Sequence, residues 1–155
     1  MTPSIEREIL IEAPVEVVWH AVTEPSQISS WFTDAAEIDV HEGGKGTLTW
    51  TGRATVKPAT AEITVVAVEP PRLFSFRWAY PDGAQPREGN SVLVEFTLAQ
   101  EGEGTRLRVT ESGLSEIDWT EENKASYAQD HINGWSKHLS DLVAYVVAKD
   151  RASVQ

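Results

Sequence analysis

Apolar and polar residues alternate near the start of the chain. Between residues 5 and 12, isoleucine occupies three of the odd positions and glutamate three of the even ones, which predicts a strand with one buried face. Pro14 ends this strand and suits the first turn of a helix. Apolar residues then recur with the spacing i, i+3, i+4 and i+7 over residues 15–22, which indicates one face of a short helix. A second short helix is predicted after Pro25.

The hydrophobic period changes to two between residues 35 and 113, so this part is predicted to be a series of strands. The spacers between the strands are short and rich in glycine, and such spacers favour an antiparallel meander over parallel crossovers. The positions that carry the period are Leu48 and Trp50; Ile63 to Val68; Phe74, Phe76 and Trp78; Val92, Val94, Phe96 and Leu98; and Leu107, Val109 and Glu111.

The last segment returns to a helical pattern. Thr120 is a suitable N-cap, and the inward stripe is Tyr127, His131, Trp135, Leu139, Leu142, Val143 and Val146. A helix of roughly 25 residues is nearly 40 Å long. The order of elements predicts an α+β fold in which a curved antiparallel sheet wraps a long C-terminal helix. We expect a single domain over residues 1–155, since no repeat or linker divides the chain.

Charge and composition exclude several classes of function. The chain has 13 basic and 24 acidic residues, a net charge of −11, which argues against binding to nucleic acid or to anionic membranes. The absence of cysteine excludes disulfides, thiolate metal sites and cysteine nucleophiles. No apolar run approaches 18 residues and no signal pattern is evident. We therefore expect a soluble, cytoplasmic protein.

The N-terminal half of the predicted long helix differs from its Leu- and Val-rich C-terminal half, because small, polar and aromatic residues alternate there. Large rings beside Gly134 and Ala128 are difficult to pack without voids, and ligand pockets are commonly lined in this way. Rings that simply fill the core are the alternative. The residues expected to line a ligand cavity are Trp50, Phe74, Phe76, Trp78, Phe96, Glu111, Tyr127, His131 and Trp135.

Three stretches resemble a known family. Residues 9–19 (ILIEAPVEVVW), 68–78 (VEPPRLFSFRW) and 131–135 (HINGW) are similar, in this order, to the START-like SRPBCC superfamily. More narrowly, they resemble the branch named after the activator of heat-shock protein 90 ATPase homologue. The resemblance covers nearly the whole chain. It implies the helix-grip fold, in which an antiparallel sheet grips a long C-terminal helix and a cavity lies between them.

The resemblance does not imply one function, because members of this superfamily include lipid carriers, hormone receptors, polyketide cyclases and cochaperone domains. No stretch resembles the asparagine- and tryptophan-rich motif of the cochaperone's additional domain, so we do not expect chaperone activation. The chain departs from the family between Glu111 and Leu114, where an aromatic residue after the glycine and an earlier histidine or neutral group are expected. One wall of the pocket is therefore expected to be acidic.

His131 and Glu111 are the weak candidates for catalysis, as a buried acid–base pair. A hydrogen-bonded histidine at the rim, without turnover, is the favoured interpretation. His131 and His138 are seven residues apart, about 10.5 Å along a helix, and one zinc ion does not readily reach both. We predict no metal site and no cofactor.

Three functions remain, in this order. The first is non-enzymatic binding of a small hydrophobic or amphipathic molecule between the C-terminal helix and the sheet. The second is interaction with a chaperone or another stress-response partner through the acidic surface. The third is a cyclase- or hydrolase-like enzyme that uses His131 and Glu111. The sequence leaves open the ligand, the oligomeric state, and whether residues 80–90 form a lid or a variable hairpin.

Overall fold

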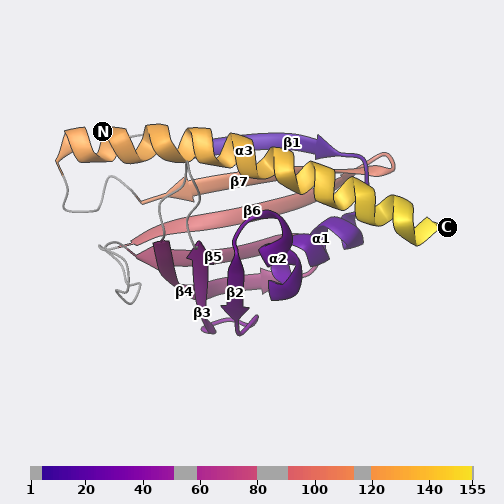
Figure 1. Ribbon diagram of the computed structural model, residues 1–155, viewed down its shortest axis with the longest axis horizontal. Helices are drawn as coiled ribbons and strands as arrows, with labels where there is room; N and C mark the ends of the chain where they lie inside the picture. The colour runs from indigo at the N-terminus through magenta and orange to yellow at the C-terminus, as the bar shows by residue number, and fades with distance from the viewer. Residues whose placement is uncertain (1–4, 51–58, 80–90, 114–119, 155) are drawn as a thin grey trace.

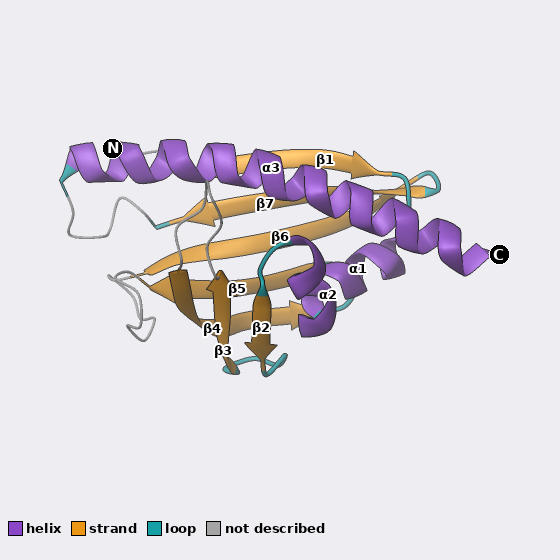
Figure 2. Ribbon diagram, viewed as in Figure 1, coloured by secondary structure: helices purple, strands orange, loops and turns teal. Residues whose placement is uncertain are grey.

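The computed structural model describes residues 5–50, 59–79, 91–113 and 120–154. Within these ranges the strands form one seven-stranded antiparallel sheet in the order β1-β7-β6-β5-β4-β3-β2 (Figure 1). Together with three helices this makes an α+β fold (Figure 2), as predicted. The strands are β1 (Ile5–Ile11), β2 (Ala35–Ile38), β3 (Lys45–Trp50), β4 (Ala59–Glu69), β5 (Leu73–Ala79), β6 (Ser91–Glu101) and β7 (Gly104–Ser112).

Strand β1 pairs with β7, and this pairing brings together the two ends of the chain's β region. Ile5 lies opposite Glu111 in the register. On the solvent face of the same pair, Glu8 binds Arg106 at 3.0 Å and Arg108 at 2.8 Å. These cross-strand charge pairs favour the observed register, and they leave the isoleucines of β1 for the interior.

The two short helices are α1 (Val15–Thr23) and α2 (Pro25–Trp31), as the apolar spacing predicts. Pro25 occupies the first turn of α2, where its missing N–H has no intrahelical partner to lose. The indole Nε1 of Trp31 donates to the carbonyl of Ala21 at 2.8 Å. This bond joins α2 to α1 and directs the Trp31 ring into the core.

Helix α3 (Glu121–Val154) is 34 residues long, so the prediction of roughly 25 residues was too short. Its N-terminus is capped as predicted, because the Oγ1 of Thr120 accepts from the N–H of Asn123 at 3.1 Å. The helix runs along β1 and then passes α1 (Figure 1). None of the helices that the structure describes is both long enough and apolar enough to cross a membrane.

The glycine-rich segment before β3 is a hairpin turn, since β2 and β3 pair antiparallel on either side of it, in agreement with the predicted antiparallel meander. Gly43 has a φ of 82°, which favours glycine. A side chain on Gly44 would meet the carbonyl oxygen of Asp39 at 1.8 Å. Residues 80–90, which the sequence leaves open as a lid or a variable hairpin, lie outside the described residues. The same holds for Leu114, where the sequence departs from the family pattern.

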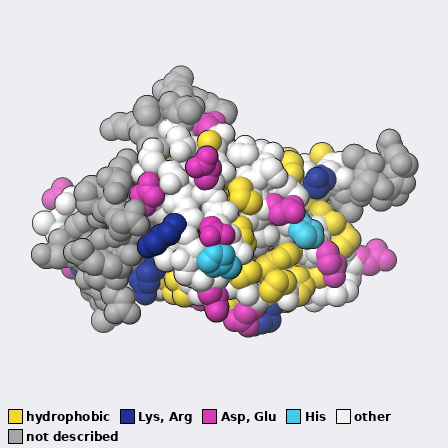
Figure 3. Space-filling model, turned by 90° about the horizontal axis from the view of Figure 1, so that it is seen from below, with side chains coloured by type: hydrophobic (Ala, Val, Ile, Leu, Met, Phe, Trp, Pro, Cys, Tyr) yellow, Lys and Arg dark blue, Asp and Glu magenta, His cyan; other side chains and the backbone are white. Residues whose placement is uncertain are grey.

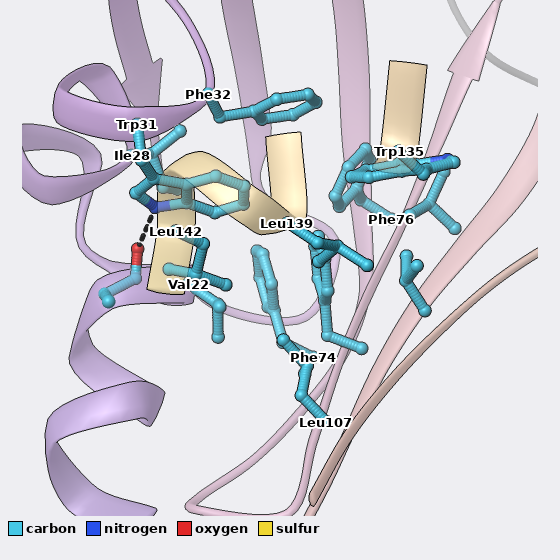
Figure 4. Close-up of a cluster of buried hydrophobic side chains, with 14 of the residues drawn as sticks. Val22, Ile28, Trp31, Phe32, Phe74, Phe76, Leu107, Trp135, Leu139 and Leu142 are labelled. Atoms are coloured by element: carbon cyan, nitrogen blue, oxygen red, sulfur yellow. Dashed lines mark hydrogen bonds between the residues drawn. The ribbon is translucent and has the colours of Figure 1, made fainter. Parts of the chain in front are cut away.

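The core lies between the sheet and all three helices. Figure 4 shows side chains of α1, α2 and α3 converging on rings of β5. The space-filling view in Figure 3 shows acidic side chains spread over one face of the molecule, with hydrophobic side chains between them. The largest fully buried side chains are Phe74, Phe96, Ile11, Leu48, Ile63, Leu107, Leu142, Glu111, Val18, Val22, Val65 and Val92. All of these are apolar except Glu111.

Candidate functional site

Glu111 is a carboxylate inside the apolar core. Alternate residues of β7 face inward, and Glu111 takes the inward position that follows Leu107 and Val109. Only 2% of its surface is exposed. Burial of an ionised carboxylate is costly unless hydrogen bonds compensate, so its partners decide whether the site is stable.

Three side chains of α3 contact this carboxylate. Tyr127, His131 and Trp135 are spaced four residues apart, so they form one stripe on the helix. The hydroxyl of Tyr127 donates to Oε2 of Glu111 at 2.7 Å. The Nδ1 of His131 lies 2.7 Å from Oε1, and the indole Nε1 of Trp135 donates to the same oxygen.

A fourth residue extends the network to the sheet. The indole Nε1 of Trp78, on β5, donates to the Tyr127 hydroxyl at 3.2 Å. Tyr127 therefore accepts from Trp78 while it donates to Glu111. We call Trp78, Glu111, Tyr127, His131 and Trp135 the Glu111 cluster.

Glu111 acts as a hydrogen-bond acceptor for at least two of its partners. Tryptophan N–H groups can only donate, and the Tyr127 hydroxyl donates its single proton to Glu111. With the proton of His131 assigned to Nδ1, this ring donates to Oε1 as well. A carboxylate offers about four acceptor positions. Within the described residues, Oε1 receives two donors and Oε2 receives one.

Aromatic rings surround the polar groups of the cluster. The ring centroids of Tyr127 and His131 are 3.7 Å apart and the rings are stacked. Trp78 meets His131 edge to face at 5.7 Å and stacks on Trp135 at 6.2 Å. The rings hold the indole and imidazole donors in fixed directions, so the carboxylate lies in a pre-organised site.

The cluster reaches the surface at His131, whose side chain is 19% exposed. Gly134 lies three residues further along the helix and is partly exposed. A Cβ atom added to Gly134 would have no neighbour within 4 Å. Because nothing in the described part of the chain packs against this position, Gly134 leaves open space on the helix surface one turn from His131. Glycine inside a helix costs about 1 kcal/mol relative to alanine.

A small apolar cavity lies on the other side of the rings, between α1, α2 and the sheet (Figure 4). Its volume is about 10 Å³, and a cavity needs about 10–15 Å³ to hold one water molecule. This cavity is thus too small for an organic ligand in the structure as it stands. It is lined by Val22, Ile28, Trp31, Phe32, Ile38, Leu48, Phe74, Phe76 and Phe96.

The residues predicted to bind a ligand fall into three groups. Five form the Glu111 cluster. Phe76 and Phe96 flank it, with ring centroids 5.5 Å from Trp78 and 5.7 Å from Trp135, respectively. Trp50 and Phe74 contact other parts of the core: Trp50 donates to the carbonyl of Phe32 at 2.9 Å, and Phe74 stacks on Phe96. A binding role for all nine stays a prediction.

The sequence interpretation assigned no role to Phe32 or His138, which both border the cluster. Phe32 follows α2 and stacks on Trp135 at 5.3 Å, while His138 meets Phe32 edge to face at 4.9 Å. Burial lowers the pKa of His138 to about 4, and nearby Lys137 acts in the same direction. The apolar run that ends in Phe32 was the only signal for the first residue. The sequence carried no local signal for His138, because its position in the core depends on which face of α3 is covered.

The cluster brings an imidazole and a carboxylate into direct contact. His131 and Glu111 form the contact expected of an acid–base pair. Within the described residues, no group of three or more histidine, aspartate or glutamate side chains is arranged to hold a metal ion.

Comparisons with known proteins agree with the architecture. A sheet that packs against one long C-terminal helix, with two short helices after the first strand, defines the helix-grip class of α+β proteins. The model of the family described as Activator of Hsp90 ATPase homolog 1-like protein matches residues 12–147. The chain belongs to this family, as the sequence resemblance indicated. No curated protein matches the chain in a sequence search.

Many solved structures share the fold. Protein MLL2253 from Mesorhizobium loti is 22% identical with a TM-score of 0.76, and the match covers 96% of this chain and 99% of that one. CalU16 from Micromonospora echinospora is 27% identical with a TM-score of 0.67, over 92% of this chain and 75% of that one. DynU16, described as a putative protein in the dynemicin biosynthetic locus, is 24% identical with a TM-score of 0.74. That match covers 97% of this chain and 49% of DynU16, so the chain spans about half of DynU16.

Proposed function

We propose that this protein binds a small hydrophobic or amphipathic molecule between α3 and the sheet, and that the Glu111 cluster contacts the polar part of that molecule. The observation that carries the proposal is the buried carboxylate with its three donors on one helix stripe. An apolar side chain of similar volume would hold α3 on the sheet at least as well, because desolvation offsets much of what buried charged groups contribute. The fold itself therefore does not require this cluster.

The N-terminal half of α3 is the part that can yield to a ligand. In the C-terminal half, Leu139, Leu142 and Val146 are at most 2% exposed and pack against the core. In the stretch before Gly134, the buried side chains are Lys124 and Tyr127, which both carry polar groups. Segments with few buried apolar contacts open at the lowest free energy. A ligand that enters here would take over contacts with the Trp78 and Trp135 rings.

Small-molecule binding also agrees with the setting of one structural neighbour. DynU16 is described as belonging to a biosynthetic locus, and the family fold often binds hydrophobic ligands. These likenesses support the class of function and leave the ligand open.

Tryptophan fluorescence tests the proposal, because Trp78 and Trp135 lie in the cluster. Titration with alkyl alcohols, flavonoids and aromatic polyketides is expected to give a saturable shift for at least one compound, together with a higher melting temperature. No saturable shift with any compound would contradict the proposal.

Gly134 offers a matched pair of variants for the same titration. Gly134→Leu fills the gap beside His131 and is expected to weaken binding at least tenfold. Asn133→Leu adds the same bulk at an exposed position one residue earlier and is expected to leave binding within twofold of the wild type. Equal effects of the two variants would remove Gly134 from the binding route.

Interaction with a chaperone is a second candidate, and the family match favours it, since the family is described by its likeness to an activator of Hsp90 ATPase. The net charge of −11 suits a basic patch on a partner. A pull-down with the middle domain of Hsp90 at 50 mM and 300 mM salt tests it. Retention at low salt and loss at high salt is the expected result, and no retention at low salt contradicts this candidate.

A further inference from the structure

We infer that the polar group of the ligand is a positively charged hydrogen-bond donor, such as the ammonium group of an alkyl- or arylamine, and that it binds Oε2 of Glu111. This inference rests on the proposed function and adds the chemical class of the ligand.

Oε2 of Glu111 can accept one more hydrogen bond. Oε1 of Glu111 receives Trp135 and His131, whereas Oε2 receives Tyr127 as its single donor within the described residues. A carboxylate oxygen accepts two hydrogen bonds. The ligand group that completes Oε2 must carry an N–H or O–H, and a carboxylate or ether ligand cannot supply one.

The charge of the cluster favours a cation among the possible donors. Glu111 carries the carboxylate of the cluster; its Tyr127 and Trp135 partners are neutral, and its third partner, His131, carries a charge only when it is protonated. Charges interact more strongly in the low-dielectric interior than at the surface. A cationic donor compensates the buried negative charge, whereas an anionic ligand adds a second one.

Besides His131, the described part of the chain has two basic residues near this end of α3, Arg7 and Lys124, and the contacts of both lie away from Glu111. Arg7 lies two positions from Ile5, which faces Glu111 in the register, but its Nε donates to the hydroxyl of Ser136 at 3.2 Å and its Nη1 to the carbonyl of Glu6. Lys124 is 3.7 Å from the carboxylate of Glu121. Neither contact directs a cation to Glu111.

The aromatic rings of the Glu111 cluster provide the surface for the rest of an amine ligand. The indoles of Trp78 and Trp135 stack on each other at 6.2 Å within the cluster, and Phe32 stacks on Trp135 at 5.3 Å, so an aromatic wall lies beside the carboxylate. Phe76, next to Trp78, offers apolar surface for the body of the ligand. An amine with a hydrophobic body therefore combines a donor for Oε2 with a surface that suits these rings.

Four probes of equal chain length separate charge from hydrogen bonding: decylamine, decyltrimethylammonium, decanol and decanoate, each kept below its micelle-forming concentration. Binding is measured at pH 8 by tryptophan fluorescence and calorimetry, and is counted only where it saturates at one molecule per chain and raises the melting temperature. We expect decylamine to bind at least tenfold more tightly than decanoate. Decanol and decyltrimethylammonium, which each lack one of the two features, should fall between them.

The outcomes distinguish this inference from the proposed function. Equal affinities, or tighter binding of decanoate than of decylamine, would overturn the inference and leave ligand binding intact. Binding of none of the probes or of the wider panel would overturn both. In Glu111→Gln, the preference for decylamine over decanoate should fall to less than threefold. The wild-type series decides the question even if that variant does not fold.

Discussion

Replacement of Glu111 by glutamine tests whether the buried cluster is as strongly connected as its geometry indicates. The amide keeps the shape of the side chain but has only one acceptor oxygen. If this oxygen stays with Trp135 and His131, the amide NH₂ faces the Tyr127 hydroxyl, which loses its acceptor. Hydrogen bonds to charged groups contribute about 1.5–3 kcal/mol each, and a buried donor without a partner costs about 1–3 kcal/mol.

We therefore expect Glu111→Gln to lower the free energy of unfolding by about 2–4 kcal/mol, a large part of the roughly 5–15 kcal/mol typical of a domain. Tyr127→Phe removes the same hydrogen bond from the other side and also leaves the Trp78 indole without its acceptor. Since the two substitutions remove one shared interaction, they should not be additive. The double variant should be more stable than the sum of the single effects predicts, by about 1–2 kcal/mol.

Urea unfolding followed by circular dichroism gives the four free energies, provided that all four proteins unfold in one transition with similar slopes. A cost below about 0.5 kcal/mol for Glu111→Gln, which is the size of an ordinary surface substitution, would refute the reasoning. Strict additivity of the two substitutions would do the same, because it would mean that the hydroxyl and the carboxylate do not interact.

Two further predictions concern α3. Burial of the His138 ring disfavours its protonated form in the folded state and lowers its pKa from 6.5 to about 4. Between these two pH values the unfolded chain binds a proton that the folded chain does not. The free energy of unfolding therefore falls as the pH drops from 6.5 to 4, by up to about 3 kcal/mol. Urea midpoints of the wild type and of His138→Leu across this range check it, and parallel pH profiles would contradict it. Gly134→Ala should raise the free energy of unfolding by about 0.5–1 kcal/mol, since alanine favours the helix and its Cβ meets no neighbour; a loss of stability in the same urea assay would show that the space at Gly134 is filled.

The sheet and the short helices could be predicted because each has one buried face and one exposed face. In β1 and β7, this alternation correctly assigned Glu111 to the interior, next to Leu107 and Val109. The length of α3 could not be predicted in the same way, because the apolar stripe ends at Val146 whereas the helix continues to Val154. Beyond the stripe there is no burial signal to extend a helix.

The contacts within the site depend on elements that are far apart in the sequence. The spacing of Tyr127, His131 and Trp135 predicted that these residues share a face, and β7 supplied Glu111 as expected. The stacking of Phe32 on Trp135 depends on where α2 packs, and the burial of His138 depends on this ring. Neither contact has a local signal.

The measurement that tests ligand binding at the Glu111 cluster most directly is the ¹⁵N–¹H spectrum of the tryptophan indoles during addition of decylamine and, separately, decanol. The indole signals of Trp78 and Trp135 should shift saturably with at least one of the two compounds, because both indoles belong to the cluster. The signal of Trp31, which is bonded to Ala21 in the core, should move much less. Unmoved signals of Trp78 and Trp135 with both compounds, or equal shifts of all three indoles, would contradict ligand binding at the cluster.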